Sequence, residues 1–195
     1  TVHPSLGVQT MKELVQLAKA KPGQLNYGSP GAGSSGHLSA ELLGFKAGIQ
    51  MVHLPYKGNS QATMDLLRGE LQVGFMNLPM ALPQVKAGKL KGLAVAGPRR
   101  VQIISEVPTM SESGLAGVEA AGWNGLFVPV GTPAPVIQRL QQETAKVMAT
   151  PAWKSQAASM GYELGGESPQ EFGQFVRQEI QKWQRVIQDA RIRIE

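Results

Sequence analysis

The sequence predicts an α/β fold with a parallel sheet, and two patterns support this prediction. Short apolar segments alternate with stretches of about ten residues that have helical periodicity, as in βαβ units. Helix start and stop signals flank these stretches: Thr10 with Glu13 forms a capping box, and Gly48 follows a helical stretch as a C-terminal stop. The 23 glycines and 13 prolines fall between the periodic segments, which indicates turns rather than disorder.

In chain order, the first part of the sequence contains four expected strands and four expected helices. The strands are expected at 24–29, 50–55, 71–76 and 90–96, and the helices at 10–21, 34–47, 60–68 and 79–87. Because a helix separates each strand from the next, we expect the strands to pair in parallel.

The last part of the chain is expected to be mainly helical. An extended stretch at 123–130 precedes a helix over 133–148, and Ser168 with Glu171 opens a long final helix. The apolar residues of this final helix form one stripe, which we expect to pack in the core: Phe172, Phe175, Val176, Ile180, Trp183 and Ile187.

Composition narrows the classes of function. The formal net charge of +5 and the pI of about 9.6 raise the question of nucleic-acid binding. However, only 17% of the residues are charged, and the basic clusters at 86–91 and 99–100 have no aromatic residues between them. A mildly basic surface that attracts anionic solutes fits better than a nucleic-acid partner. The chain has no cysteine, and no apolar run reaches the roughly 18 residues of a membrane span.

The most informative segment is YGSPGAGSSGH, residues 27–37, between an expected strand and an expected helix. Glycines let the backbone approach a ligand closely, serines supply hydroxyl groups, and the first helical turn presents unpaired N–H groups. Together these groups can hold an anion without a charged side chain. A tight turn with an N-cap would explain one glycine and one serine, but not four glycines and three serines.

The same segment contains G-x-G-x-x-G at Gly31, Gly33 and Gly36, so dinucleotide binding has to be considered. That motif requires an acidic residue at the end of the next strand, but residues 53–58 there read HLPYKG and include no acidic residue. Lys57 could meet the phosphate of NADP, which keeps an NADP-dependent oxidoreductase open as the alternative. The sequence does not match a phosphate-binding P-loop or a G-x-S-x-G nucleophile motif.

Few residues suit catalysis or metal binding. The only histidines are His3, His37 and His53, and no two of them have the spacing of a helical metal site. We expect His53 to be structural, whereas helix packing and ligand contact are equally open for His37. No local pattern suggests paired carboxylates for acid–base catalysis. We therefore expect a binding protein without catalytic residues, cofactor or metal, rather than an enzyme.

Seven segments, in order and in register over nearly the whole chain, resemble one family. They are KELVQLAKAKPGQLNYGS at 12–29, GAGSSGHL at 31–38, HLPYKG at 53–58, LLRGELQVGF at 66–75, AGKLKGLAV at 87–95, EVPTMSESG at 106–114 and PVGTPAPVIQRL at 129–140. The family is that of the substrate-binding receptors of tripartite tricarboxylate transporters, or Bug-type receptors. The resemblance implies a periplasmic protein with two α/β lobes that close like a flytrap on a small carboxylate, which membrane transporter subunits then receive.

The resemblance also implies a division of the chain. Residues 5–118 would form the second lobe, and 119–195 would form only the C-terminal part of the first lobe, because the sequence begins where the family's N-terminal half-lobe ends. Residues 119–195 would then lack sheet partners and expose apolar surface, including the stripe on the last helix. Such a chain is expected to self-associate, exchange elements with a second copy or need a further segment.

Site residues follow from the resemblance position by position. One ligand carboxylate would be surrounded by Ser29, Gly31, Ala32, Gly33, Ser34 and Ser35. His37 and Tyr56 match positions that shape the pocket, and for Lys57 a structural role and ligand contact are equally open. Asn77 is an expected hydrogen-bonding contact. Met76 stands where amino-acid-binding members often have an acidic residue, so we expect a ligand without an amino group near it.

Overall fold

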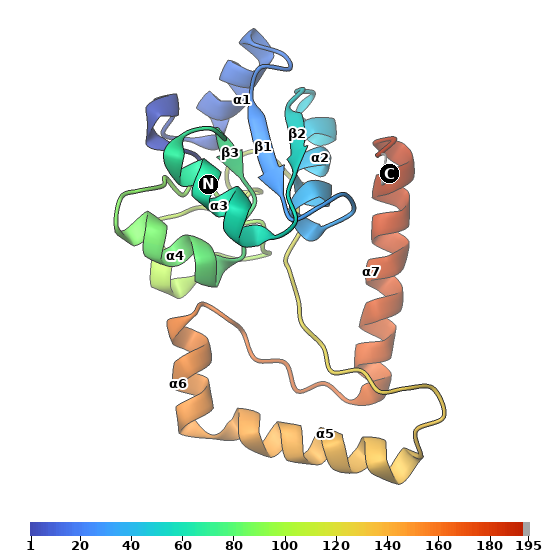
Figure 1. The fold of residues 1–195 in the computed structure, drawn as a ribbon. Coiled ribbons are helices and arrows are strands. Elements are labelled where there is room, and N and C mark those ends of the chain that lie inside the picture. The colour runs from blue at the N-terminus through green and yellow to red at the C-terminus, as the bar shows by residue number, and fades with distance from the viewer. Residues whose placement is uncertain (193–195) are drawn as a thin grey trace. The chain divides into compact units, whose positions relative to one another are not determined.

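Three short parallel strands form the centre of the first of two units in the protein. The computed structural model (Figure 1) describes residues 1–192. The first unit comprises Thr1–Gly122 with the end of the last helix from Val186, and the second comprises Trp123–Arg185. The strands are β1 (Asn26–Ser29), β2 (Val52–Pro55) and β3 (Val73–Gly74), in the order β2-β1-β3. The expected parallel pairing is therefore confirmed.

Four helices accompany these strands at the expected places. They are α1 (Met11–Ala20), α2 (Ser35–Ala47), α3 (Asn59–Arg68) and α4 (Leu78–Lys86), with short 3-10 turns at Pro4–Leu6 and Gln102–Ile104. Helices α2 and α3 connect the strands, α1 precedes β1 and α4 follows β3. The predicted caps are present. The Thr10 hydroxyl accepts the amide of Glu13, and Gly48, at φ 62°, ends α2 in the left-handed conformation that glycine adopts readily.

The two faces of the sheet are covered by different helices. Tyr27 of β1 stacks with His37 of α2, whereas Gly28 faces Ala62 of α3 and Leu71. Because successive side chains of a strand point to opposite faces, α2 and α3 lie on opposite sides of β1. The largest fully buried side chains of the unit are Tyr27, Leu14, Leu43, Leu66, Leu71, Leu90, Val2 and Val118.

The expected strand at 90–96 does not form, and the expected strand at 71–76 shortens to two residues. Instead, Val2 pairs antiparallel with both Val73 and Lys91 through single bridges. The amide of Val2 donates to the carbonyl of Lys91 at 2.9 Å, and the reverse bond is also 2.9 Å. Val2 therefore occupies the place beside β3 that a fourth parallel strand would need. The prediction of a strand was wrong, although Leu90 and Leu93 are buried as they would be in a strand. They lie in a segment that forms only isolated bridges and no ladder of hydrogen bonds with a neighbouring strand.

The second unit contains helices and connecting segments but no strand among its described residues. Its helices are α5 (Ala134–Ala149), α6 (Pro151–Ser159) and α7 (Pro169–Asp189), which continues into the first unit. The predicted capping box of the last helix is present, since the Ser168 hydroxyl accepts the Glu171 amide and the Glu171 carboxylate accepts the Ser168 amide. The sequence analysis missed α6, although Thr150 followed by Pro151 is a start signal.

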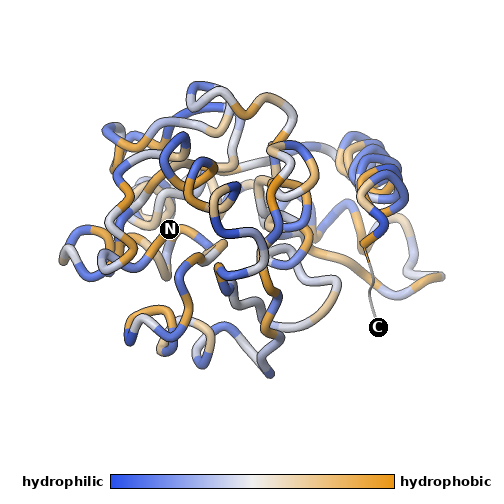
Figure 2. Tube along the Cα trace, turned by 90° about the horizontal axis from the view of Figure 1, so that it is seen from above, coloured by the Kyte–Doolittle hydropathy of each residue, from blue (hydrophilic) through white to orange (hydrophobic). Residues whose placement is uncertain are grey.

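The periodicity predicted that the apolar stripe of α7 packs in the core, and this prediction is wrong. The exposure of the stripe agrees instead with the incomplete lobe that the resemblance implies. Hydrophobic and hydrophilic residues alternate along α7 in Figure 2, but none of its described residues is buried. Phe172 and Phe175 form an aromatic cluster with Trp123, at centroid distances of 5.7 and 5.4 Å. Ile180 stays half exposed, because this unit has no sheet against which the stripe could pack.

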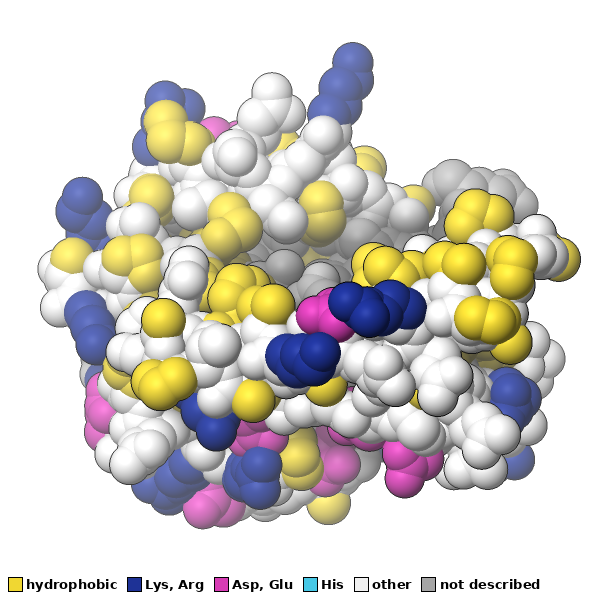
Figure 3. All heavy atoms as spheres, turned by 90° about the horizontal axis from the view of Figure 1, so that it is seen from below, with side chains coloured by type: hydrophobic (Ala, Val, Ile, Leu, Met, Phe, Trp, Pro, Cys, Tyr) yellow, Lys and Arg dark blue, Asp and Glu magenta, His cyan; other side chains and the backbone are white. Residues whose placement is uncertain are grey.

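Further hydrophobic side chains of the second unit are exposed. They include Leu126, Phe127, Val128, Val130, Val136, Leu140, Val147, Trp153 and Tyr162. Figure 3 shows hydrophobic side chains gathered on one surface of the protein, beside a small group of charged side chains. Patches of this kind commonly mark surfaces that another segment or protein covers.

The bridge at Val2 gives the first prediction. Val2 is 1% exposed, so Val2→Ala should remove roughly two buried methylene equivalents and lower the free energy of unfolding by about 2 kcal/mol. Chemical denaturation followed by circular dichroism measures this change. Val52→Ala, at a half-exposed position of β2, is the matched control and should change the value by less than about 0.5 kcal/mol. Equal effects of the two substitutions would show that Val2 is not part of the core.

Candidate functional site

The predicted binding residues lie where the three strands end. Ser29 is the last residue of β1, Tyr56 directly follows β2, and Asn77 is the N-cap residue of α4 shortly after β3. Because neighbouring parallel strands end at the same edge of the sheet, these positions come together, as is usual for ligand sites in open α/β sheets. The Tyr56 amide donates to the Ser29 carbonyl at 2.9 Å, which ties two of the three ends directly.

The glycine-rich loop crosses this edge and leads into α2. A Cβ atom at Gly36 would lie 3.2 Å from the Phe75 carbonyl oxygen, a tight contact, so glycine favours the close approach of the start of α2 to the segment after β3. Gly33 has φ 74°, in the left-handed region. A small cavity of about 20 Å³ lies beside the loop, with Gly28, Ser29, Pro30, Asn59, Phe75 and Met76 among its lining residues.

Three amide groups of the loop and of the first turn of α2 lack a hydrogen-bond partner within the described part of the chain. They belong to Ala32, Ser35 and Gly36. Ala32 and Ser35 are exposed, and the Ser35 hydroxyl also has no partner among these residues. Unpaired N–H groups at the start of a thirteen-residue helix carry partial positive charge. Groups of this kind can donate hydrogen bonds to an anion.

The other polar groups of the loop hold the loop itself. The Ser34 hydroxyl caps α2 by accepting the His37 amide and donates to the Gly31 carbonyl at 2.6 Å. The Gly31 amide donates to the Ser29 hydroxyl, and the Gly33 amide donates to Nδ1 of His37 at 3.0 Å. In this structure the predicted carboxylate contacts thus divide into groups that are free to bind and groups that shape the loop.

Two histidines stack behind the loop. The rings of His37 and His53 lie 4.0 Å apart at 13°, and Tyr27 stacks on His53 at 5.0 Å. Burial lowers the pKa of His37, opposed by the negative charge of Glu41. Burial also lowers the pKa of His53, and the neighbouring His37 lowers it further, again opposed by Glu41. Both rings are therefore held in the neutral form more strongly than in an unfolded chain.

The remaining predicted residues have different surroundings. The Tyr56 hydroxyl donates to Asp65 at 2.9 Å, and both Tyr56 and Met76 pack against the core cluster around Leu66. Burial, followed by the hydrogen bond to Asp65, raises the pKa of Tyr56. Lys57 and Asn77 are exposed, and the Asn77 side chain makes no capping bond in α4.

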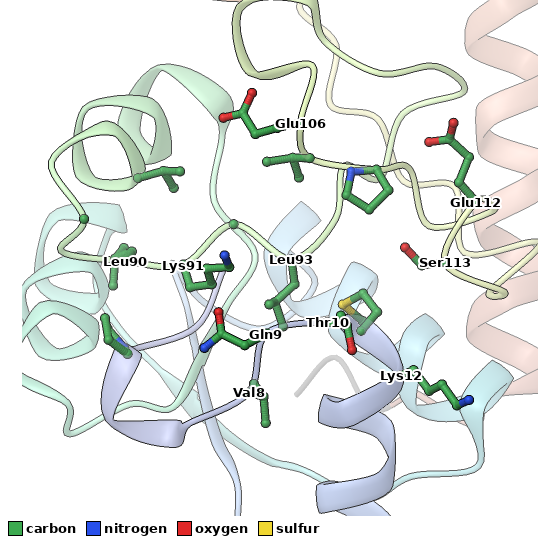
Figure 4. Close-up of a pocket in the computed structure, with 17 residues that line it drawn as sticks. Val8, Gln9, Thr10, Lys12, Leu90, Lys91, Leu93, Glu106, Glu112 and Ser113 are labelled. Atoms are coloured by element: carbon green, nitrogen blue, oxygen red, sulfur yellow. The ribbon is translucent and has the colours of Figure 1, made fainter.

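A larger hollow of about 730 Å³ lies elsewhere in the first unit, between the start of α1 and the segments around 90–93 and 106–113. Figure 4 shows Lys91 beside Gln9, with Glu106 and Glu112 farther along the wall. Its charged groups, Lys12, Lys91, Glu106 and Glu112, are exposed and of both signs, and Glu112 is already paired with Arg100 at 2.8 Å. Because these charges are of both signs and one acidic group is already paired, size alone does not make the hollow the better binding site.

Within residues 1–192, no three His, Asp or Glu side chains are grouped so that they could hold a metal ion. No helix in that range is both long and apolar enough to cross a membrane.

Comparison with known proteins assigns the chain to a family. The family model of the tripartite tricarboxylate transporter family receptor (TctC) matches residues 1–192. The chain belongs to this family. The resemblance of the seven sequence segments is thereby confirmed.

Individual relatives agree with this assignment. A UPF0065 protein in the gbd 5' region of Cupriavidus necator is 35% identical over 181 residues, which are 93% of this chain and 55% of that protein. The structure of R. palustris Rpa4515 with adipate is 34% identical with a TM-score of 0.92, and that of the periplasmic binding protein BugD is 26% identical with a TM-score of 0.87. Each match covers 98% of this chain and 64% of the other. The chain spans about half the length of its curated relative.

Two predictions can be compared with these findings. The α/β fold of periplasmic binding proteins, for a chain that covers only part of the family's two lobes, is confirmed by the structural matches. The relatives are receptors and binding proteins rather than enzymes, which favours the binding hypothesis over an NADP-dependent oxidoreductase.

Sequence reasoning missed the part that His53 and Glu41 play at the loop. Nε2 of His53 lies 2.6 Å from the Ser29 hydroxyl, and Glu41 accepts a hydrogen bond from Tyr27. The placement of His53 depends on the register that sets it opposite Tyr27 in the sheet. No short-range pattern contains this register. Glu41, in contrast, follows His37 by one helical turn, and this spacing could have suggested that the two are neighbours.

The loop conformation gives a second prediction. Gly33→Ala places a Cβ atom on a left-handed residue and should lower the free energy of unfolding by about 1–2 kcal/mol. Thermal unfolding followed by calorimetry measures the loss. Gly97→Ala is the control, since the new Cβ would make only ordinary contacts of 3.6 Å or more. An unchanged free energy of unfolding in the Gly33→Ala variant would contradict the left-handed conformation of Gly33.

The neutral histidines give a third prediction. Because the unfolded chain takes up these protons first, the free energy of unfolding should fall as the pH drops below the ordinary histidine pKa of 6.5. The loss should continue down to the lower folded-state pKa values, with a slope of at most about 1.4 kcal/mol per pH unit for each histidine. Denaturation midpoints determined from pH 8 to pH 5, which is roughly the range in which histidine titrates, measure this dependence. In the double variant His37→Asn, His53→Gln, this part of the dependence should disappear.

Proposed function

We propose that the chain is the ligand-binding part of an extracytoplasmic receptor that captures a small carboxylate. The unpaired amides of Ala32, Ser35 and Gly36 at the start of α2 carry this proposal. A carboxylate placed there would accept charge-assisted hydrogen bonds from backbone groups that are already fixed by the loop. The net charge of +5 would raise the local concentration of such a ligand.

The chemistry of the ligand follows from the surroundings of this seat. Rpa4515, which is 34% identical, is described with adipate, a dicarboxylate. Met76, beside the small cavity, packs on the apolar cluster and offers no charge to an ammonium group. We infer a mono- or dicarboxylate without an amino group near Met76, with Asn77 as a further hydrogen-bonding contact and with His37 and Tyr56 shaping the wall.

The proposal includes the division into lobes. Residues 5–118 are assigned to the second lobe, with the carboxylate seat formed by Ser29, Gly31, Ala32, Gly33, Ser34 and Ser35. Residues 119–195 are assigned to the C-terminal part of the first lobe, a proposal supported by the exposed apolar side chains of the second unit. A second copy or a further segment would cover these side chains.

The destination of the ligand follows from the family. As in receptors of tripartite tricarboxylate transporters, the bound acid would pass to membrane transporter subunits. The site of action would then be the periplasm, as in the periplasmic relative BugD.

Titration of the ¹⁵N-labelled chain with adipate, followed by nuclear magnetic resonance, tests the carboxylate seat. The amide resonances of Ala32, Ser35 and Gly36 should move most, because these groups would donate to the ligand. At 100 times its dissociation constant, adipate should also stabilise the chain by about 2.7 kcal/mol, or roughly 5–10 °C.

A charge introduced at the seat provides the matched comparison. Ser35→Glu should abolish these shifts, because its carboxylate competes with and repels the ligand, whereas Ser155→Glu, at an exposed position of α6, should leave them intact. Shifts confined to the hollow around Lys91, or the same response in both variants, would refute the seat at α2.

A further inference from the structure

The histidine pair behind the glycine-rich loop supplies none of the hydrogen bonds proposed for the ligand, yet its own hydrogen bonds end on the loop. His37 is 4% exposed and projects from the first turn of α2. His53 lies in β2, opposite Tyr27 of β1. One ring bonds to Gly33 and the other to Ser29, so the pair contacts the loop near both of its ends.

The bond to Gly33 determines the protonation of His37. A backbone amide can only donate, so Nδ1 of His37 must present its lone pair to the Gly33 N–H at 3.0 Å. An imidazolium carries hydrogen on both ring nitrogens and would place two N–H groups against each other. This bond therefore exists only while Nδ1 of His37 is unprotonated.

His53 is constrained less directly. The Ser29 hydroxyl has one proton and two acceptors within reach, the Gly31 carbonyl at 2.9 Å and Nε2 of His53 at 2.6 Å. Either direction of the Ser29–His53 bond is therefore possible. Two charged rings stacked at 4.0 Å would repel each other, however, so at most one of them can readily become charged.

The groups around the pair limit how a charge there could be compensated. Tyr27, from β1, stacks on His53 and donates to Glu41, while Ser29 and Gly33 belong to the loop. Glu41, from α2, is the acidic side chain that acts on both rings, and its carboxylate already accepts the Tyr27 hydroxyl. Neutral rings are therefore the form that these contacts fit.

We propose that His37 and His53, in their neutral form, are positioning residues that hold the glycine-rich loop in its anion-binding shape, and that protonation of His37 releases Gly33. The link to anion binding rests on the function proposed above, whereas the coupling between His37 and the loop stands without it. While the Gly33 amide is bonded to His37, the amides of Ala32 and Ser35 have no partner among the described residues, and both residues are exposed. The release would give this loop a dependence on pH that a loop held by backbone bonds alone would lack.

A ligand-free pH titration of the ¹⁵N-labelled protein tests this coupling. At neutral pH, Nδ1 of His37 should be the bare ring nitrogen and Nε2 the protonated one. On acidification the Gly33 amide resonance should move with the same midpoint as the His37 ring. A protonated Nδ1 at neutral pH, or a Gly33 resonance that stays still while His37 titrates, would overturn the inference.

Two variants of His37 separate the hydrogen bond from the packing of the ring. His37→Phe keeps an aromatic ring for stacking but has no acceptor, so the Gly33 amide should exchange with solvent about fivefold faster, as expected from one lost hydrogen bond. His37→Asn places an oxygen near the position of Nδ1 and should restore slow exchange without the dependence on pH. Equal exchange rates in His37→Phe and the wild type would also overturn the inference.

Titration with adipate at neutral pH distinguishes this inference from the proposed function. His37→Phe should bind adipate more weakly than both the wild type and His37→Asn, because only His37→Phe lacks an acceptor for the Gly33 amide. If adipate moves no amide in any variant while Gly33 still follows His37, the proposed function fails and the coupling stands. If adipate binds His37→Phe and the wild type equally, the positioning role fails and the proposed function stands.

Discussion

The parallel pairing of β1 with both of its neighbours is the constraint on which the candidate site depends. With β1 between β2 and β3, the chain leaves three strands at one edge of the sheet. The amide of Tyr56 bonds to the carbonyl of Ser29, and Gly36 approaches the carbonyl of Phe75. Neither approach would occur if the order or direction of the strands differed. The sheet thus brings together loops that are distant in the chain; Ser29 and Tyr56, for example, are 27 residues apart.

At that edge, one loop combines two kinds of group that have different tasks. Ser34 caps α2, Ser29 and His37 bind the amides of Gly31 and Gly33, and the loop is fixed without any ligand. The amides that remain, at Ala32, Ser35 and Gly36, point to no partner in the described chain. Such preorganisation matters for binding, because a loop that is already ordered loses little conformational entropy when the ligand arrives.

The second unit differs from the first in how its apolar residues are used. In the first unit, alternating faces of the strands are covered by α2 and α3, and this unit holds all the buried apolar side chains of the described residues except Ala157. In the second unit, α7 has a regular apolar stripe and an aromatic cluster with Trp123, yet none of its described residues is buried. An amphipathic helix is stabilised mainly by packing of its apolar face, so this surface is the least self-sufficient part of the chain.

Local patterns in the sequence determined the elements that depend on neighbours a few residues away. The caps at Thr10 and Gly48, the α/β alternation and the glycine-rich loop all follow from such patterns. Tertiary structure alone decided the rest. Val2 displaces the expected strand at 90–96, and His53 reaches Ser29, because both contacts join residues whose separation in the chain carries no local signal. Burial of the α7 stripe likewise depends on a packing partner, which periodicity does not supply.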